Sequence, residues 1–124
     1  MPREDQHRQK AGLNEAFAER LDASDATCEN WAVVAAFYSA LHHIQSYFAK
    51  HSVEAKSHEE RFDQIKKDEK LRPALPSYKY LYTLSLTARY YCSGLPVEAY
   101  SKEAKPRLAA VKKQVDLALK ATTK

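Results

Sequence analysis

Between residues 31 and 48 the sequence places apolar side chains at the spacing of an α-helix, and this pattern narrows the choice of folds more than any other. At about 100° per residue, one broad side of such a helix is apolar. That side comprises Val33, Phe37, Leu41, Ile44 and Phe48, widened by Trp31, Val34 and Tyr38. The strip left over is narrow and polar: Ser39, His43, Ser46 and Lys50. A helix that is apolar over most of its surface is predicted to lie at the centre of a bundle.

Four further helices are predicted around this central one, which is the second of the five along the chain. The first covers residues 4–21, with Leu13, Ala16, Phe17 and Leu21 on its inner face. The central helix starts at a cap residue, Ser24 or Asp25, and reaches about Lys50. A third covers residues 57–68, because Ser57 and Glu60 have the spacing of a capping box. Two prolines in residues 71–76 disfavour a helix there, so the fourth starts at Ser77 and ends near Cys92.

The last two helices also have distinguishable faces. In residues 77–92 the predicted core side is Tyr80, Leu81, Leu84, Ala88 and Tyr91, and a separate polar and aromatic seam is Tyr78, Tyr82, Ser85 and Arg89. After a turn at residues 93–96, the last helix reaches about Thr122 and turns inward Leu108, Val111, Val115 and Leu119. Pro106 is compatible with a regular helix that begins near it, or with a kink at that residue.

Composition agrees with helices. There are 2 glycines in 124 residues, fewer than the turns of a sheet protein of this size normally need. The fold class predicted is therefore all-α, an up-and-down helical bundle of about five helices in one domain, 1–124. The longest apolar stretch, residues 31–41, covers about 16 Å as a helix, too short to span a membrane. The charged N-terminus lacks a secretory signal, and the two cysteines do not make a disulfide framework, so a cytoplasmic protein with reduced thiols is expected.

The positive charge is concentrated at one end of the chain. Residues 101–124 hold 7 Lys and Arg against 2 Asp and Glu, whereas residues 1–100 hold 13 against 14. The lysines predicted to point away from the core of the last helix, and thus to contact nucleic acid, are Lys102, Lys105, Lys112, Lys113 and Lys120. The alternative is that this face is only solvated.

Neither a metal nor a cofactor is predicted. The adjacent His42 and His43 point about 100° apart on a helix, and no histidine has the ligand spacing of a helical zinc site. With 2 isolated glycines the chain has no phosphate-binding P-loop. Cys28, near a helix N-terminus, has Asp25 and Glu29 beside it, which oppose a reactive thiolate.

Three segments resemble small prokaryotic members of the HEPN family. They are residues 30–43 (NWAVVAAFYSALHH), residues 56–61 (KSHEER) and residues 87–90 (TARY), followed by a terminal helix rich in Glu, Ala and Lys. The resemblance covers roughly residues 25–122 and is carried by Tyr38, His42, Ser57, His58 and Arg89. It implies an up-and-down helical bundle that is frequently a homodimer. It also implies either a metal-independent ribonuclease or a noncatalytic binder of nucleic acid or nucleotide, often a toxin paired with a nucleotidyltransferase antitoxin.

This sequence departs from the ribonuclease members, which carry an Arg followed by a His after a spacer of about four to six residues. No Arg here has such a partner, and Ala35 stands where the Arg is expected. The candidates for a rebuilt catalytic site are His42, His58, Arg61 and Arg89. The alternatives are that His42 is a hydrogen-bonded boundary residue and that Arg61 pairs with Asp63 or Glu60.

The hypothesis favoured by the sequence is a noncatalytic HEPN-like binding module. It would contact nucleic acid, or a protein partner such as a nucleotidyltransferase of a toxin–antitoxin pair, and form a homodimer through helix faces left uncovered. A ribonuclease toxin with His and Arg from different helices is the alternative, and a purely structural or antitoxin-like subunit is a third.

Overall fold

The computed structural model describes residues 3–21, 25–91 and 94–121. Within these ranges the chain forms five α-helices and no strand, which confirms the all-α prediction. The helices are α1 (Glu4–Arg20), α2 (Ala26–Lys50), α3 (His58–Lys67), α4 (Leu75–Tyr90) and α5 (Lys105–Ala121). The ends predicted at Ser24, Cys92 and Thr122 lie outside the described residues.

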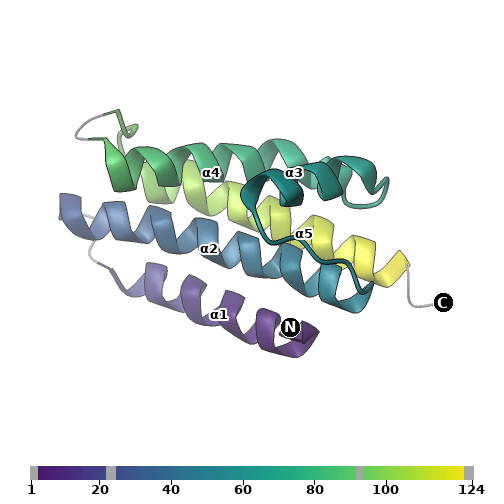
Figure 1. The fold of residues 1–124 in the computed structure, drawn as a ribbon. Coiled ribbons are helices and arrows are strands. Elements are labelled where there is room, and N and C mark those ends of the chain that lie inside the picture. The colour runs from purple at the N-terminus through teal and green to yellow at the C-terminus, as the bar shows by residue number, and fades with distance from the viewer. Residues whose placement is uncertain (1–2, 22–24, 92–93, 122–124) are drawn as a thin grey trace.

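The long helices run up and down beside one another. Figure 1 shows α1 and α2 side by side and antiparallel, with α4 and α5 forming the opposite side of the bundle and the short α3 crossing in front of them. Helix α2 contacts α1, α4 and α5, as expected for the central helix. The start of α1 and the end of α5 lie at the same end of the bundle.

Two of the predicted caps determine where helices start. The Asp25 carboxylate accepts a hydrogen bond from the Cys28 amide at 3.0 Å, and the Ser57 hydroxyl accepts one from the Glu60 amide at 3.1 Å. The Glu60 carboxylate reaches one residue further back than in a capping box and accepts from the Lys56 amide at 2.6 Å. Ser57 therefore starts α3 as predicted.

The predicted cap at Ser77 is wrong. A 3₁₀ turn, Arg72–Ala74, leads directly into α4, which already begins at Leu75 and has Pro76 in its first turn. Proline is tolerated there because its missing amide hydrogen is one that a helix start leaves without a helical acceptor anyway. Pro106 lies in the first turn of α5, directly after a π-helical segment, Ala99–Ala104, so the regular helix begins beside this proline.

The core follows the predicted apolar side of α2 and the inner face of α5. Phe37, Ile44 and Phe48 are buried together with Leu108, Val111 and Val115. Trp31 is an exception to the prediction, because 52% of its surface remains exposed. It lies near the start of α2 and lines a hollow together with residues of the last turn of α4.

Helix α1 packs through a different face from the one predicted. Leu13 and Phe17 are 59% and 43% exposed, whereas Ala11 and Ala18 are buried, together with His7. The Ser39 hydroxyl of α2 donates to the Ala11 carbonyl at 2.8 Å, a contact that requires a close approach of the two helices. Small side chains permit that approach, so α1 covers the polar strip of α2.

The two faces predicted for α4 are also partly exchanged. Tyr78 and Ser85, placed in the seam, are buried, and Tyr91, placed in the core, is 65% exposed. Tyr91 follows the last residue of the helix, so the helical angle no longer applies to it. Tyr78 packs instead against the rings of Phe37 and Phe62, with centroids 5.6 and 5.7 Å away.

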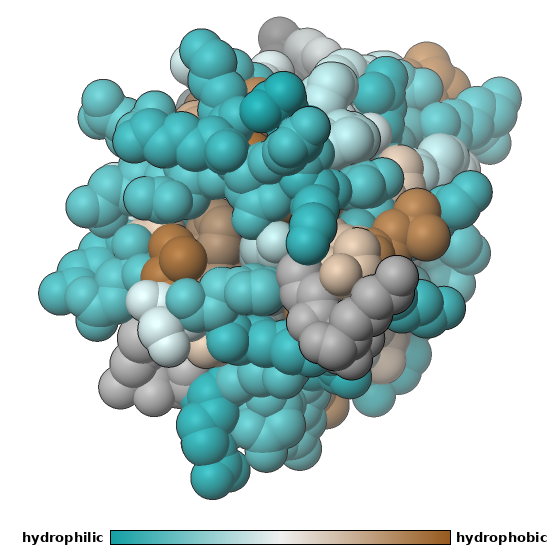
Figure 2. Space-filling view, turned by 90° about the vertical axis from the view of Figure 1, so that its right-hand side faces the viewer, coloured by the Kyte–Doolittle hydropathy of each residue, from teal (hydrophilic) through white to brown (hydrophobic). Residues whose placement is uncertain are grey.

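The surface at the end that carries both termini is mostly hydrophilic, and Figure 2 shows its hydrophobic atoms only in small, separate patches. No helix in the described part of the chain has the length and apolar character to cross a membrane.

Candidate anion-binding site

Arg61 is the most deeply buried charged residue of the predicted site, with 8% of its surface exposed. Cap formation at Ser57 places His58 and Arg61 in successive turns of α3, and an Arg61 Nη lies 2.9 Å from His58 Nδ1. The other Nη donates a long hydrogen bond of 3.5 Å to the Ala55 carbonyl, and the buried Nε has no hydrogen-bond partner among the described residues. The guanidinium is therefore only partly satisfied.

The ion pair expected for Arg61 is not formed. Glu60 is engaged by the Lys56 amide, and Asp63 pairs with Lys67 at 3.1 Å on the outer face of α3. Burial of a guanidinium without a carboxylate is costly, so this arginine departs from the usual behaviour of a structural charge.

Arg89 of α4 is likewise held by neutral groups. Its guanidinium donates to the Tyr38 hydroxyl at 3.1 Å, to the Ser85 carbonyl at 3.3 Å and to the Ser85 hydroxyl at 3.4 Å. It also lies over the Tyr38 ring, 5.7 Å from the centroid. These contacts orient the side chain, and no carboxylate among the described residues pairs with it.

The ring of Phe37 brings these elements together. Its centroid lies 5.8 Å from that of His58, 5.6 Å from that of Tyr78 and 5.6 Å from that of Tyr82, so α2, α3 and α4 meet on one buried phenyl group. We refer to Tyr38, His58, Arg61, Tyr78 and Arg89 as the arginine–histidine cluster. Tyr38, His58 and Arg89 are half-buried, which leaves one side of the cluster open to solvent.

The two arginines of the cluster lower the pKa values of the groups beside them. Burial lowers the pKa of His58, and the charges of Arg61 and Arg89 lower it further. Burial raises the pKa of Tyr78 to about 12, and the charge of Arg61 opposes that rise. No carboxylate among the described residues contributes to either shift, so the cluster is a place where an anion would be stabilised.

His42 lies beside this cluster with a different partner, His7 of α1. Their Nδ1 atoms are 3.0 Å apart and their rings stack with centroids 5.2 Å apart. Burial lowers the pKa of His42 to about 4, with further lowering by the charges of His7, Lys10, Arg61 and His43. The hydrogen-bonded boundary histidine considered from the sequence is thus observed.

The sequence did not indicate a role for His7 or Lys10. Together with Gln6 and His42 they line a hollow of about 330 Å³. The spacing of His7, Ala11 and Ala18, which share one helical face, could have indicated that His7 is turned toward the bundle.

The predicted nucleic-acid-binding lysines are largely engaged in ion pairs. Lys102 pairs with Glu98 at 2.6 Å, Lys105 with Glu19 at 2.9 Å and Lys112 with Glu15 at 2.8 Å. The last two pairs connect α5 to α1 across α2. Two of the positive charges predicted for this helix are therefore paired with glutamates of α1.

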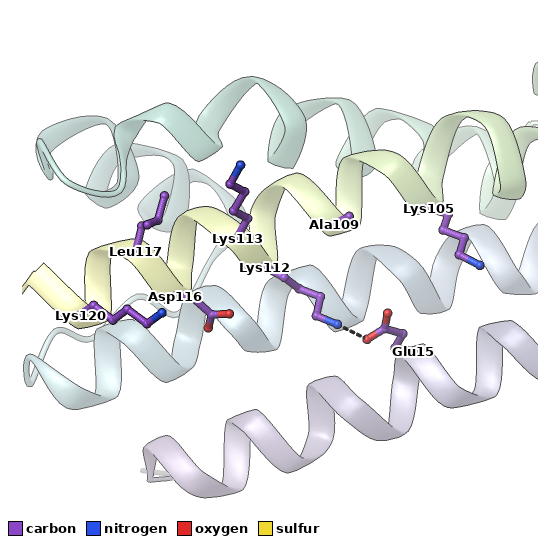
Figure 3. Close-up of a pocket in the computed structure, with 8 residues that line it drawn as sticks. All are labelled: Glu15, Lys105, Ala109, Lys112, Lys113, Asp116, Leu117 and Lys120. Carbon is purple, nitrogen blue, oxygen red and sulfur yellow. Dashed lines mark hydrogen bonds and ion pairs between the residues drawn. The ribbon is translucent and has the colours of Figure 1, made fainter.

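Figure 3 shows how four of these lysines border a hollow of about 500 Å³. Lys112 points toward α1 and Glu15, and Lys120 and Asp116 turn the same way. Lys113 and Leu117 extend to the opposite side of α5. The lysines therefore do not form one continuous stripe that faces a single direction.

Two further sequence expectations concern cysteines and metals. Cys28 is a free, half-buried thiol, and Cys92 lies outside the described residues. In the described ranges no three His, Cys, Asp or Glu side chains are grouped as metal ligands.

Comparison with known proteins returned no matching family model, no matching curated protein and no matching solved structure.

Proposed function

We propose that this chain is a noncatalytic HEPN-like module that binds a phosphate group of nucleic acid in the arginine–histidine cluster. The observation that carries the proposal is Arg61, a guanidinium nine-tenths buried with an unpartnered Nε and no carboxylate. A phosphate oxygen would supply both the missing acceptor and the missing negative charge. Planar guanidinium groups suit this task because they bind two phosphate oxygens at once.

Arg89 supports the same ligand. It approaches from a different helix and is held in position by Tyr38 and Ser85. Its positive charge, like that of Arg61, lowers the pKa of His58. Two arginines that pair with no carboxylate among the described residues favour an anion over a neutral ligand, and the neutral His58 ring can offer it a hydrogen bond.

Cleavage of RNA, the second candidate function, finds less support. General acid–base cleavage needs one group that accepts a proton and one that donates it. The pKa of His42 is about 4 and that of His58 is also lowered, so both rings are predominantly neutral at pH 7. Ala35, which stands in place of the ribonuclease arginine, is buried in the core. Cleavage of single-stranded RNA that is abolished by His42→Ala or Arg89→Ala, with the fold intact, would reverse this preference.

The direct test compares arginine variants in binding to a labelled single-stranded RNA at fixed salt. Arg61→Gln and Arg89→Gln should each lower the affinity about 10- to 150-fold, the range for loss of a hydrogen bond to a charged group. Arg20→Gln, an exposed residue of α1, removes the same charge and serves as the matched control. Arg61→Lys retains the charge without the planar fork and should recover only part of the affinity.

Circular dichroism melting establishes that each variant is folded before binding is compared. Folded Arg61→Gln and Arg89→Gln proteins that bind as tightly as Arg20→Gln would contradict the proposal. If Arg61→Gln does not fold, the comparison of Arg89→Gln with Arg20→Gln decides the test, because Arg89 is only half-buried.

The proposal includes association with a second copy or with a nucleotidyltransferase-like protein. Its support is the exposed pair Leu13 and Phe17, four residues apart on the outer face of α1. Light scattering of the isolated protein tests the homodimer, and a mass near 14.1 kDa at all micromolar concentrations would contradict it.

A further inference from the structure

A third hollow, distinct from those at His42 and at the α5 lysines, lies where the first turns of α2 meet the last turn of α4 and has a volume of about 330 Å³. Trp31 and Asn30 line it from α2, and Arg89 and Tyr90 line it from α4. Its volume falls in the range of small-molecule sites, and apolar atoms make up most of its wall, as is usual for such sites.

The aromatic side chains of this hollow are unusually exposed. Trp31 is 52% exposed and Tyr90 is 68% exposed, although residues of this size and apolarity normally contribute to cores. More than half of each side chain is therefore accessible to a ligand. Val34 and Ala88 complete the apolar wall, and the Asn30 amide offers both a donor and an acceptor.

Arg89 belongs to this hollow and to the arginine–histidine cluster. The centre of its guanidinium lies 5.1 Å from the Tyr90 ring centroid, while the same group donates to Tyr38 at 3.1 Å. A ligand that places an aromatic ring in the hollow therefore places an attached anionic group beside a guanidinium that pairs with no carboxylate among the described residues.

We infer that the hollow holds one unstacked nucleobase, sandwiched against Trp31 and Tyr90, with its phosphate at Arg89. The phosphate part of this inference rests on the proposed function, whereas the stacking part does not. Bases in a duplex are stacked and paired, so the site would select single strands. The base can come from a free nucleotide or from a nucleotide within a single strand, because both present the same ring and phosphate.

The single tryptophan of the chain is Trp31, so tryptophan emission, excited at a wavelength that tyrosine does not absorb, reports this hollow. Titrations use uridine, uridine monophosphate, inorganic phosphate, a short oligouridylate and the same oligomer in a duplex. Uridine monophosphate or the single-stranded oligomer should quench the emission, and inorganic phosphate and the duplex should not. Quenching by the oligomer alone identifies the strand as the source, and quenching by the mononucleotide identifies a free nucleotide as sufficient.

Variants separate stacking from phosphate binding. Tyr90→Ala should weaken binding about 5- to 150-fold, the range for one base stacked on an aromatic side chain. Tyr91→Ala is the matched control, because Tyr91 is 65% exposed and does not line the hollow. Arg89→Gln should weaken binding of uridine monophosphate more than binding of uridine, because the phosphate lies at Arg89. Arg61→Gln tests whether the rest of the arginine–histidine cluster contacts the same phosphate.

The outcomes distinguish the two proposals. Equal binding by Tyr90→Ala and Tyr91→Ala, or no quenching by uridine, the monophosphate or the oligomer, would overturn the base site. Loss with Tyr90→Ala but not with Arg61→Gln would retain the base site and reject the phosphate role of Arg61.

Discussion

His7 of α1 and His42 of α2 bring their Nδ1 atoms within 3.0 Å of each other, in the contact between the two helices. Such a contact needs at least one neutral ring, since only an unprotonated nitrogen can accept. Lys10 and Arg61 add positive charge from α1 and α3. Protonation of both rings would therefore break this contact between α1 and the rest of the bundle.

This pair predicts acid sensitivity of the fold. The pKa of His42 is about 4 in the folded state against an ordinary 6.5, so between these values the unfolded chain binds a proton that the folded chain does not. Stability from this group is complete above about pH 6.5 and is lost as the pH falls toward 4. The melting temperature of His42→Gln should therefore fall less between pH 7 and pH 4.5 than that of the parent. His51→Gln, at an exposed histidine, is the control, and a parallel decline in all three proteins would contradict the prediction.

Gly12 predicts a stabilising substitution. It lies in the middle of α1, is exposed, and a Cβ added there would meet no atom within 4 Å. Gly12→Ala should raise the free energy of unfolding by about 0.5–1 kcal/mol, because alanine restricts the unfolded chain and favours the helix. Chemical denaturation measures the change. Gly94→Ala should instead destabilise, since Gly94 has a φ of +111°, and a loss of stability in Gly12→Ala would refute the argument.

Ser57 predicts a connection between a helix cap and the site. Ser57→Ala removes the acceptor of the Glu60 amide at the start of α3 and should cost about 1 kcal/mol of stability. Because His58 is the first residue of α3, RNA affinity should fall as well. Ser57→Asp, which restores a capping oxygen, should recover the stability. Equal melting temperatures for Ser57→Ala and the parent would show that the cap contributes nothing.

The lysines of α5 predict unequal effects on salt dependence. Lys113 is exposed and has no ion pair among the described residues, whereas Lys112 is paired with Glu15. If this face contacts phosphates, Lys113→Gln should reduce the slope of log affinity against log salt by about 0.7, and Lys112→Gln by less. RNA titrations at several salt concentrations measure both. Equal reductions would mean that the ion pair opens on binding, and no reduction in either would leave the face as solvated surface.

The sequence by itself was sufficient to predict the presence of the helices and the residues at the centre of the core. The apolar repeat of residues 31–48 and the inward face at Leu108, Val111 and Val115 follow from the helical period alone, because burial must repeat every 3.6 residues along a packed helix. Caps at Asp25 and Ser57 were equally local, since each depends on atoms within three residues. The start of α4 was misplaced because a proline is compatible with both a loop and a first helical turn.

Only the tertiary structure decided which polar and aromatic side chains meet. The sequence nominated His42, His58, Arg61 and Arg89 separately, but the partner of His42 is His7, 35 residues away, and that of Arg89 is Tyr38, 51 residues away. It also could not foresee that Lys105 and Lys112 would be matched by glutamates of α1. Helical periodicity predicts which side of a helix is buried, but it does not predict which other helix covers that side. Pairing between distant residues depends on helix order and on close approach through small side chains such as Ala11 and Ala18, which only the folded chain provides.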